Sequence, residues 1–181
     1  MVTYPQPAVW PNQVVQQFIQ SLLAQPIRPP AGVAPAAHPL HHQPTLASYA
    51  VANTSYPPDE CWFNCVDYCV NAGGTIPVFG WAIWQAGPST LVAQHHAVVD
   101  DSGALIDVSL GPIATPLLFV PDNNAPFDFN ALRFPFSFEQ SPSGQLWFST
   151  AGTSPTFAIA RAPFSPRASA VIAAGRAAGV I

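Results

Sequence analysis

A cysteine near the centre of this chain is placed where thiol chemistry is favourable. A thiol attacks a carbonyl carbon only as the thiolate, so a nucleophilic cysteine needs surroundings that stabilise negative charge. Pro57 and Pro58 end the preceding segment, and Cys61 then falls in the first turn of a predicted helix. The free backbone N–H groups of that turn stabilise negative charge. The same N–H groups can hold the oxyanion of a tetrahedral intermediate. The adjacent Asp59 and Glu60 oppose the thiolate, and a nearby imidazolium would have to outweigh them.

An imidazole and a carboxylate that would complete this chemistry lie on a predicted hairpin. His95 and His96 fall on its first strand and Asp107 on its second, around residues 100–103. Side chains alternate along a strand, so the turn decides which histidine shares a face with Asp107. A loop of two or four residues selects His96, whereas a loop of three residues selects His95. Nucleophile, base and tautomer-fixing carboxylate form a coherent set, but spacing alone leaves both histidines open.

The three cysteines also permit other interpretations. Cys61, Cys65 and Cys69 recur every four residues, so one helix face could bury all three, and we interpret Cys65 and Cys69 as core residues. Their odd number and close spacing exclude a disulfide framework and indicate a reducing compartment. Structural zinc on Cys61, Cys65, His95 and His96 is the competing chemistry. Adjacent histidines on a strand point to opposite faces, which argues against that site.

A second group of histidines lies upstream, in a proline-rich segment. His38, His41 and His42 are imidazoles that could bind a transition metal, but no carboxylate or cysteine lies near them in the sequence. We therefore predict neither a metal ion nor any other cofactor.

The elements that position these residues can be read from apolar spacing and breakers. A helix is predicted from Pro11 to just before Pro26, followed by an extended connector over residues 26–46, which contains six prolines. The helix that carries Cys61 is predicted over residues 60–70. Strands are predicted at residues 78–84, 91–99, 104–109, 117–120, 131–138, 145–149 and 157–161, and a last helix at residues 166–178. One helix before a run of antiparallel strands predicts the α+β class.

Four short segments carry a resemblance to a known family. These are Cys61-Trp62-Phe63-Asn64, Gly80-Trp81, His96-Ala97-Val98-Val99 and the leucine-x-aspartate strand at residues 103–109. Together they resemble a group of bacterial proteins within the papain-like superfamily of cysteine peptidases, amidases and transglutaminases. The resemblance covers residues 61–109, and it implies a papain-like α+β fold in which the helix carrying the nucleophile packs on an antiparallel β-sheet.

The resemblance also implies roles for individual residues. It places the nucleophile on Cys61, the base on His96 and the orienting residue on Asp107, which selects His96 over His95. Papain-like enzymes supply an oxyanion donor from just upstream of the cysteine, for which Asn53 and Tyr56 are the candidates. Trp81, beside the flexible Gly80, and His95 are further candidates for substrate binding. The other aromatic residues of this region, and Trp81 itself unless it reaches the cleft, are interpreted as core.

The expected function is that of a cysteine-nucleophile amide hydrolase or acyltransferase, namely a protease, amidase, deamidase or transglutaminase acting through a thioester. The expected substrate is a protein or a peptide-like amide. Two alternatives stay open: a protein-binding module without catalysis on the same scaffold, and a zinc-stabilised interaction domain. Asn64 is expected to hold the first helical turn by hydrogen bonding.

The composition sets the remaining limits. The chain has 181 residues with 49% hydrophobic and 8% charged residues, five arginines and no lysine, so binding to nucleic acid is not expected. We expect an N-terminal helix and Pro-rich extension over residues 1–48 and a catalytic domain over residues 49–181. No signal peptide or membrane span is recognised. The expected location is the cytoplasm, or outside the cell after export by a specialised system, and the oligomeric state stays open.

Overall fold

The computed structural model describes residues 6–49, 56–57, 59–87, 90–109, 115–135, 137–140, 146–148, 159–161 and 165–181. Within them are three helices, α1 (Gln13–Leu23), α2 (Cys61–Ala72) and α3 (Pro166–Ala177). The strands are β1 (Gln6–Pro7), β2 (Thr45–Tyr49), β3 (Ile76–Gly87), β4 (Thr90–Asp101), β5 (Ala104–Asp107), β6 (Leu117–Pro121), β7 (Arg133–Pro135), β8 (Phe138–Gln140), β9 (Leu146–Phe148) and β10 (Ile159–Arg161).

Five of these strands close into a barrel. β3 pairs with β4 and with β6, β6 pairs with β2, β2 pairs with β5, and β5 pairs back to β4. The β2–β5 pair is parallel and the others are antiparallel. β1, β8 and β9 extend the sheet outside the ring, and β7 pairs with β10 in a separate small sheet. The chain is therefore a mixed α/β protein with a closed barrel.

The predicted fold class, an α+β papain-like helix packed on an antiparallel β-sheet, is wrong. β3 and β4 are twelve residues long, and their outer edges pair with β6 and β5. β2 then joins β5 to β6, which closes the ring and leaves no open sheet there. Residues 45–46 of β2 fall inside the predicted connector, and this is the barrel strand that sequence reasoning missed.

The barrel interior is filled by alternating apolar side chains, as period-two strands require. Ala47, Val78, Ala82, Val98, Leu105, Leu117 and Phe119 form this inner cluster, together with Trp84 at its edge. At Gly80, β3 and β6 approach so closely that a Cβ atom would overlap the Val120 carbonyl oxygen and lie 2.9 Å from the Pro121 Cα. Glycine is required there because any side chain would push the two strands apart.

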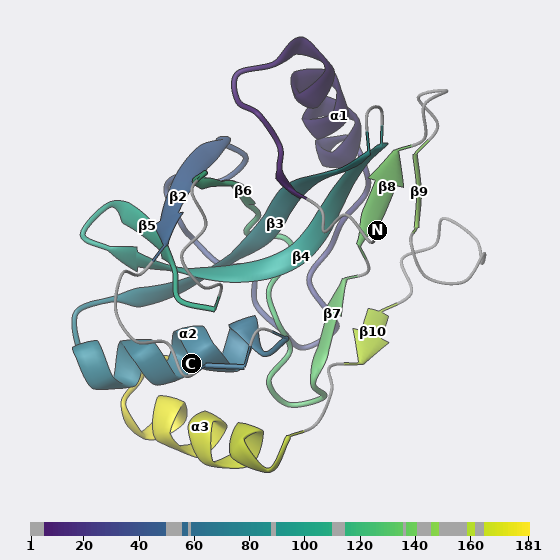
Figure 1. Cartoon of the computed structure of the whole chain (residues 1–181). Coiled ribbons are helices and arrows are strands. Elements are labelled where there is room, and N and C mark those ends of the chain that lie inside the picture. The colour runs from purple at the N-terminus through teal and green to yellow at the C-terminus, as the bar shows by residue number, and fades with distance from the viewer. Residues whose placement is uncertain are drawn as a thin grey trace.

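Two helical layers cover the outside of the barrel (Figure 1). α1 packs its buried residues Val15, Phe18, Ile19 and Leu22 in a cluster with residues of β3, β4 and β6. α2 and α3 lie side by side at the other end of the molecule in Figure 1, and α2 packs on β4 and β3. No helix in the described part of the chain has the length and apolar character to cross a membrane.

The two helix starts differ slightly from the predicted ones. The helix predicted from Pro11 begins at Gln13, because the Asn12 side-chain oxygen caps α1 by accepting the Val14 N–H at 2.9 Å. α2 has Glu60 as its N-cap, without a capping side-chain bond, and Cys61 is its first residue. The division of the chain near residue 48 stays a prediction.

Candidate functional site

Cys61 is the first residue of α2, and it packs in a cluster with residues of the barrel strand β4. The first N–H groups of an α-helix have no acceptor within the helix, and the Asn64 N–H, which binds the Glu60 carbonyl at 2.9 Å, is where the ladder begins. Cys61 is 5% exposed, and its sulfur lies near enough to the His96 ring to contribute to the raised pKa of that histidine. The helix start and an imidazole therefore meet at one sulfur atom.

His96 and Asp107 form a buried pair on neighbouring strands. The His96 Nε2 lies 2.7 Å from the Asp107 Oδ2, and the other carboxylate oxygen accepts the Ser109 N–H at 2.8 Å. With Nε2 engaged by the carboxylate, Nδ1 is the ring nitrogen left for the Cys61 sulfur. Burial would lower the pKa of His96, but the Asp107 carboxylate and the Cys61 sulfur outweigh it and raise that pKa well above 6.5.

The β4–β5 turn decides which histidine joins this group. Asp101 pairs with Ala104, so the loop consists of Ser102 and Gly103 alone, with φ angles of 54° and 95°. This two-residue loop turns His96 and Asp107 toward the same face of the hairpin. The choice that spacing had left open is settled by backbone conformation at two residues.

His95 points to the opposite face and is held as a core residue. The Trp62 Nε1–H donates to its Nδ1 at 3.0 Å, so its Nε2–H donates to the Ala125 carbonyl at 2.8 Å. Both ring nitrogens are engaged, which leaves neither a zinc ligand for Cys61 and Cys65 nor a contact for substrate. The structure therefore does not form the competing zinc site.

The lowered pKa of His95 leads us to expect that the protein loses stability in mild acid. Burial is the main cause that lowers its pKa to about 4, against an ordinary value of 6.5. Between these two values the unfolded chain binds a proton that the folded chain does not, so stability falls as pH falls through this window. The shift corresponds to about 3 kcal/mol. Urea unfolding of wild type and His95→Gln from pH 7 to pH 4 should show a flatter profile for the variant; parallel profiles would contradict the assignment.

The remaining predicted site residues lie elsewhere. The Tyr56 hydroxyl is hydrogen bonded to Asp67, its ring lies 4.9 Å from the Arg167 guanidinium carbon, and burial raises its pKa to about 12. Trp81 is fully buried, and its Nε1–H donates to the Asp122 Oδ2 at 2.9 Å. Trp81 is therefore a core residue, the Tyr56 hydroxyl is engaged by Asp67, and Asn53 lies outside the described residues.

Cys65 and Cys69 are buried along the same face of α2. Burial raises the pKa of both thiols, well above the ordinary value for Cys65. They pack in the cluster between α2, the barrel and α3, in agreement with their interpretation as core residues.

A polar network lies behind Cys61, and sequence reasoning expected the hydrogen-bonding role of Asn64 in it but not the part played by Arg167. Asn64 is fully buried, donates to the Pro57 carbonyl at 2.7 Å and to the Ser109 hydroxyl at 3.1 Å, and accepts from the Arg167 Nη1 at 2.7 Å. Arg167 also pairs with Glu60 at 3.3 Å. This network ties the first turn of α2 to α3 and to the end of β5. Arg167 stands about a hundred residues from its partners, so no local pattern could have indicated it.

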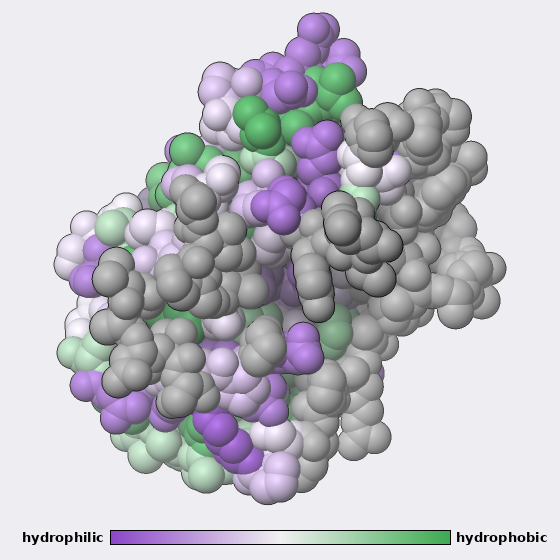
Figure 2. Space-filling model, in the orientation of Figure 1, coloured by the Kyte–Doolittle hydropathy of each residue, from purple (hydrophilic) through white to green (hydrophobic). Residues whose placement is uncertain are grey.

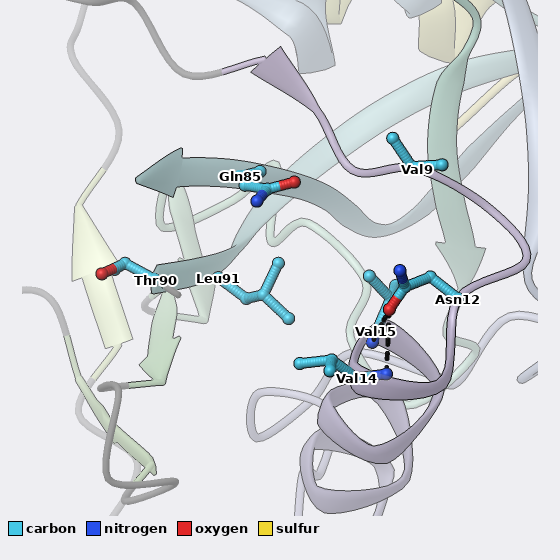
Figure 3. Close-up of a pocket in the computed structure, with 7 residues that line it drawn as sticks. All are labelled: Val9, Asn12, Val14, Val15, Gln85, Thr90 and Leu91. Carbon is cyan, nitrogen blue, oxygen red and sulfur yellow. Dashed lines mark hydrogen bonds between the residues drawn. The ribbon is translucent and has the colours of Figure 1, made fainter. Parts of the chain in front are cut away.

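Two hollows lie on other parts of the surface. One, with a volume of about 120 Å³, is bordered by Val9, Asn12, Val14 and Leu91 between the N-terminal segment, α1 and β4 (Figure 3). Val9 and Val14 are exposed apolar residues, and Figure 2 shows apolar surface over α1. The other hollow is lined mainly by residues 26–31. Neither is lined by Cys61 or His96.

Comparison with known proteins finds no match: no protein-family model, no curated protein and no solved structure is similar to this chain. The resemblance of residues 61–109 to a cysteine hydrolase group thus stays a prediction, and functional inference has to stand on the geometry of the site.

Proposed function

We propose that this chain is a cysteine-nucleophile amide hydrolase or acyltransferase, with Cys61 as nucleophile, His96 as base and acid, and Asp107 as the residue that orients the imidazole. One observation carries the proposal: the His96 ring lies 2.7 Å from the Asp107 carboxylate, and the Cys61 sulfur is near enough to the same ring to raise its pKa. Each group occupies the place that this chemistry needs, and the first residue of a helix supplies the sulfur.

The raised pKa of His96 supports a thiolate–imidazolium pair as the reactive form. Asp107 accepts the Nε2–H bond and so keeps the ring oriented with Nδ1 toward sulfur. In the proposed reaction the thiolate attacks the carbonyl carbon of an amide, and the carbonyl π electrons move onto oxygen. When this tetrahedral intermediate collapses, the C–N bond breaks and His96 gives its proton to the departing amine. The product is a thioester on Cys61.

The second half-reaction runs through the same groups. Neutral His96 removes a proton from the incoming acceptor, which attacks the thioester carbon and releases the Cys61 thiolate. With water as acceptor the enzyme is a hydrolase, and with an amine it is an acyltransferase. The backbone N–H groups at the start of α2 are the proposed oxyanion donors, since Tyr56 is bonded to Asp67. The proposed substrate is a protein or a peptide-like amide.

Asn64 and Arg167 act as positioning residues in this proposal. Asn64 holds the chain before α2 and the chain after β5 against the first helical turn. Arg167 places a positive charge 3.3 Å from Glu60, the acidic residue next to the nucleophile. This ion pair offsets the charge that would otherwise disfavour a thiolate at Cys61.

The proposal is tested by trapping the thioester. The protein is incubated with an activated acyl donor, such as a peptide p-nitrophenyl ester, quenched in acid, and examined by intact-protein and peptide mass spectrometry. We expect one acyl group, located on Cys61, that is discharged by hydroxylamine. Cys61→Ala should acquire none, and Cys65→Ala, the matched control on the same helix face, should acylate as wild type does. Acylation that is equal in wild type and Cys61→Ala, or its absence from both, would favour the protein-binding alternative.

A further inference from the structure

The histidines of the proline-rich connector meet a carboxylate that the sequence places far away. His41 and His42 lie against Asp122, which follows β6 some eighty residues later. The His42 Nε2 is 3.3 Å and the His41 Nδ1 is 3.9 Å from the Asp122 Oδ1. One donor atom from each of the three residues lies within 4.8 Å of the others, the only such group of three or more among the described residues. The sequence shows no carboxylate near these histidines, and this was the reason for predicting no metal; the tertiary structure brings Asp122 to them.

These distances fit a shared ion better than a direct hydrogen bond. Charge-assisted N–H···O bonds usually measure about 2.7–2.9 Å, so the His42–Asp122 separation of 3.3 Å is long for one. Zinc bonds of about 2.0–2.2 Å place neighbouring tetrahedral ligands about 3.3–3.6 Å apart. The His42 separation lies in this range, and the His41 separation of 3.9 Å would need to shorten by a few tenths of an ångström.

Carboxylates that bind a metal through one oxygen are usually hydrogen bonded through the other, and Asp122 has such a bond. The residue is 1% exposed, and the Trp81 Nε1–H holds its Oδ2 at 2.9 Å, which leaves Oδ1 directed at the two imidazoles. The Asn124 N–H also reaches Oδ1, at 3.0 Å. Within the described ranges no arginine forms an ion pair with Asp122, and its ion-pair partners are the imidazoles of His41 and His42 alone.

His42 is held toward Asp122 by an unusual backbone. Its φ angle is 61°, a left-handed conformation that a histidine adopts only at a cost, and its N–H binds the Pro121 carbonyl at 2.8 Å. The His41 and His42 side chains are about one-third exposed, so an ion could reach them from solvent.

We propose that His41, His42 and Asp122 bind one zinc-type divalent ion, with water completing the coordination. The ligands are His42 Nε2, Asp122 Oδ1 and His41 Nδ1. The His41 nitrogen now accepts the Asn123 N–H at 3.0 Å and would exchange that bond for the ion. The ion fastens the connector to the end of β6, on residues that have no part in the cysteine chemistry. His38 is not a ligand, because its ring bonds Asp100 and the Leu40 N–H.

Zinc titration of the untagged full chain by isothermal calorimetry tests this proposal. We expect one Zn²⁺ per chain and a higher melting temperature with zinc than with a chelator. His42→Gln, whose side chain is partly exposed, should weaken binding by about tenfold or more and abolish the thermal shift. Asp122→Asn should do the same where it folds. His38→Gln and Cys61→Ala serve as controls and should bind zinc as wild type does.

The opposite results overturn the site. A wild-type chain that takes up no zinc, or a His42→Gln variant that binds as tightly as wild type, would show that these three residues do not form it. Loss of binding in Cys61→Ala would move the metal to the cysteines. None of these outcomes depends on acyl transfer, so the metal site and the proposed enzyme can fail separately.

Discussion

Replacing His96 by alanine is expected to slow the alkylation of Cys61 by iodoacetamide at pH 7 by about 30-fold or more. Iodoacetamide reacts with the thiolate, and the proposed His96 imidazolium is the positive charge that would stabilise a thiolate beside it. The pKa of His96 is raised well above 6.5, in part by the Cys61 sulfur, so wild type should stay reactive down to pH 6 and the variant should not. Asp107→Asn should give an intermediate rate, because the ring stays but loses its charged partner.

Timed alkylation followed by peptide mass spectrometry measures all three cysteines in one experiment. Cys65 and Cys69 are internal controls, because burial raises the pKa of both thiols. Cys61 should react far faster than either of them in wild type. Equal and slow reaction at all three positions, unchanged in His96→Ala, would mean that Cys61 is a core residue and would remove the basis of the proposed enzyme.

Replacing Trp81 by alanine is expected to lower the free energy of unfolding by about 3–5 kcal/mol. Trp81 is fully buried where α1 covers the barrel, and it contacts Phe138 edge to face. Its indole N–H also satisfies the buried Asp122 carboxylate. Truncation therefore leaves a cavity and an undersatisfied carboxylate at the same place.

Urea unfolding monitored by circular dichroism measures this loss. Trp81→Phe, which keeps a ring but removes the N–H donor, should lose less, about 1–3 kcal/mol. In the folded fraction of both variants, Cys61 should alkylate at the wild-type rate, because Trp81 does not line that site. Unchanged stability together with altered acyl transfer would instead give Trp81 the substrate contact that its sequence position beside Gly80 had suggested.

Local features of the site were accessible to sequence reasoning because they depend on a few neighbouring residues. Breakers before Cys61 indicated that a helix begins near it, and α2 does begin at this residue. The alternation of β4 and β5 placed one histidine beside Asp107, but the choice required the φ angles of Ser102 and Gly103. The same dipeptide is compatible with loops of different length, so its sequence alone does not select one.

Features that depend on distant pairing could not be read in this way. β2 was partly assigned to the connector because it is short and follows six prolines, and its partners β5 and β6 lie far along the chain. Without β2 the strands read as an open sheet, which led to the wrong fold class. Arg167 and Asp122 were likewise overlooked, since their partners Asn64 and His42 are remote in sequence.

The sequence by itself determined where the nucleophile helix begins, which residue types surround it and which strands alternate, because these properties follow from local sterics and periodicity. Only the tertiary structure decided that the strands close into a barrel, that His96 rather than His95 meets Cys61, and that a carboxylate reaches the connector histidines. The physical reason is that barrel closure is a property of strand pairing over long separations. Such pairing fixes the register, and the register determines which side chains share a face.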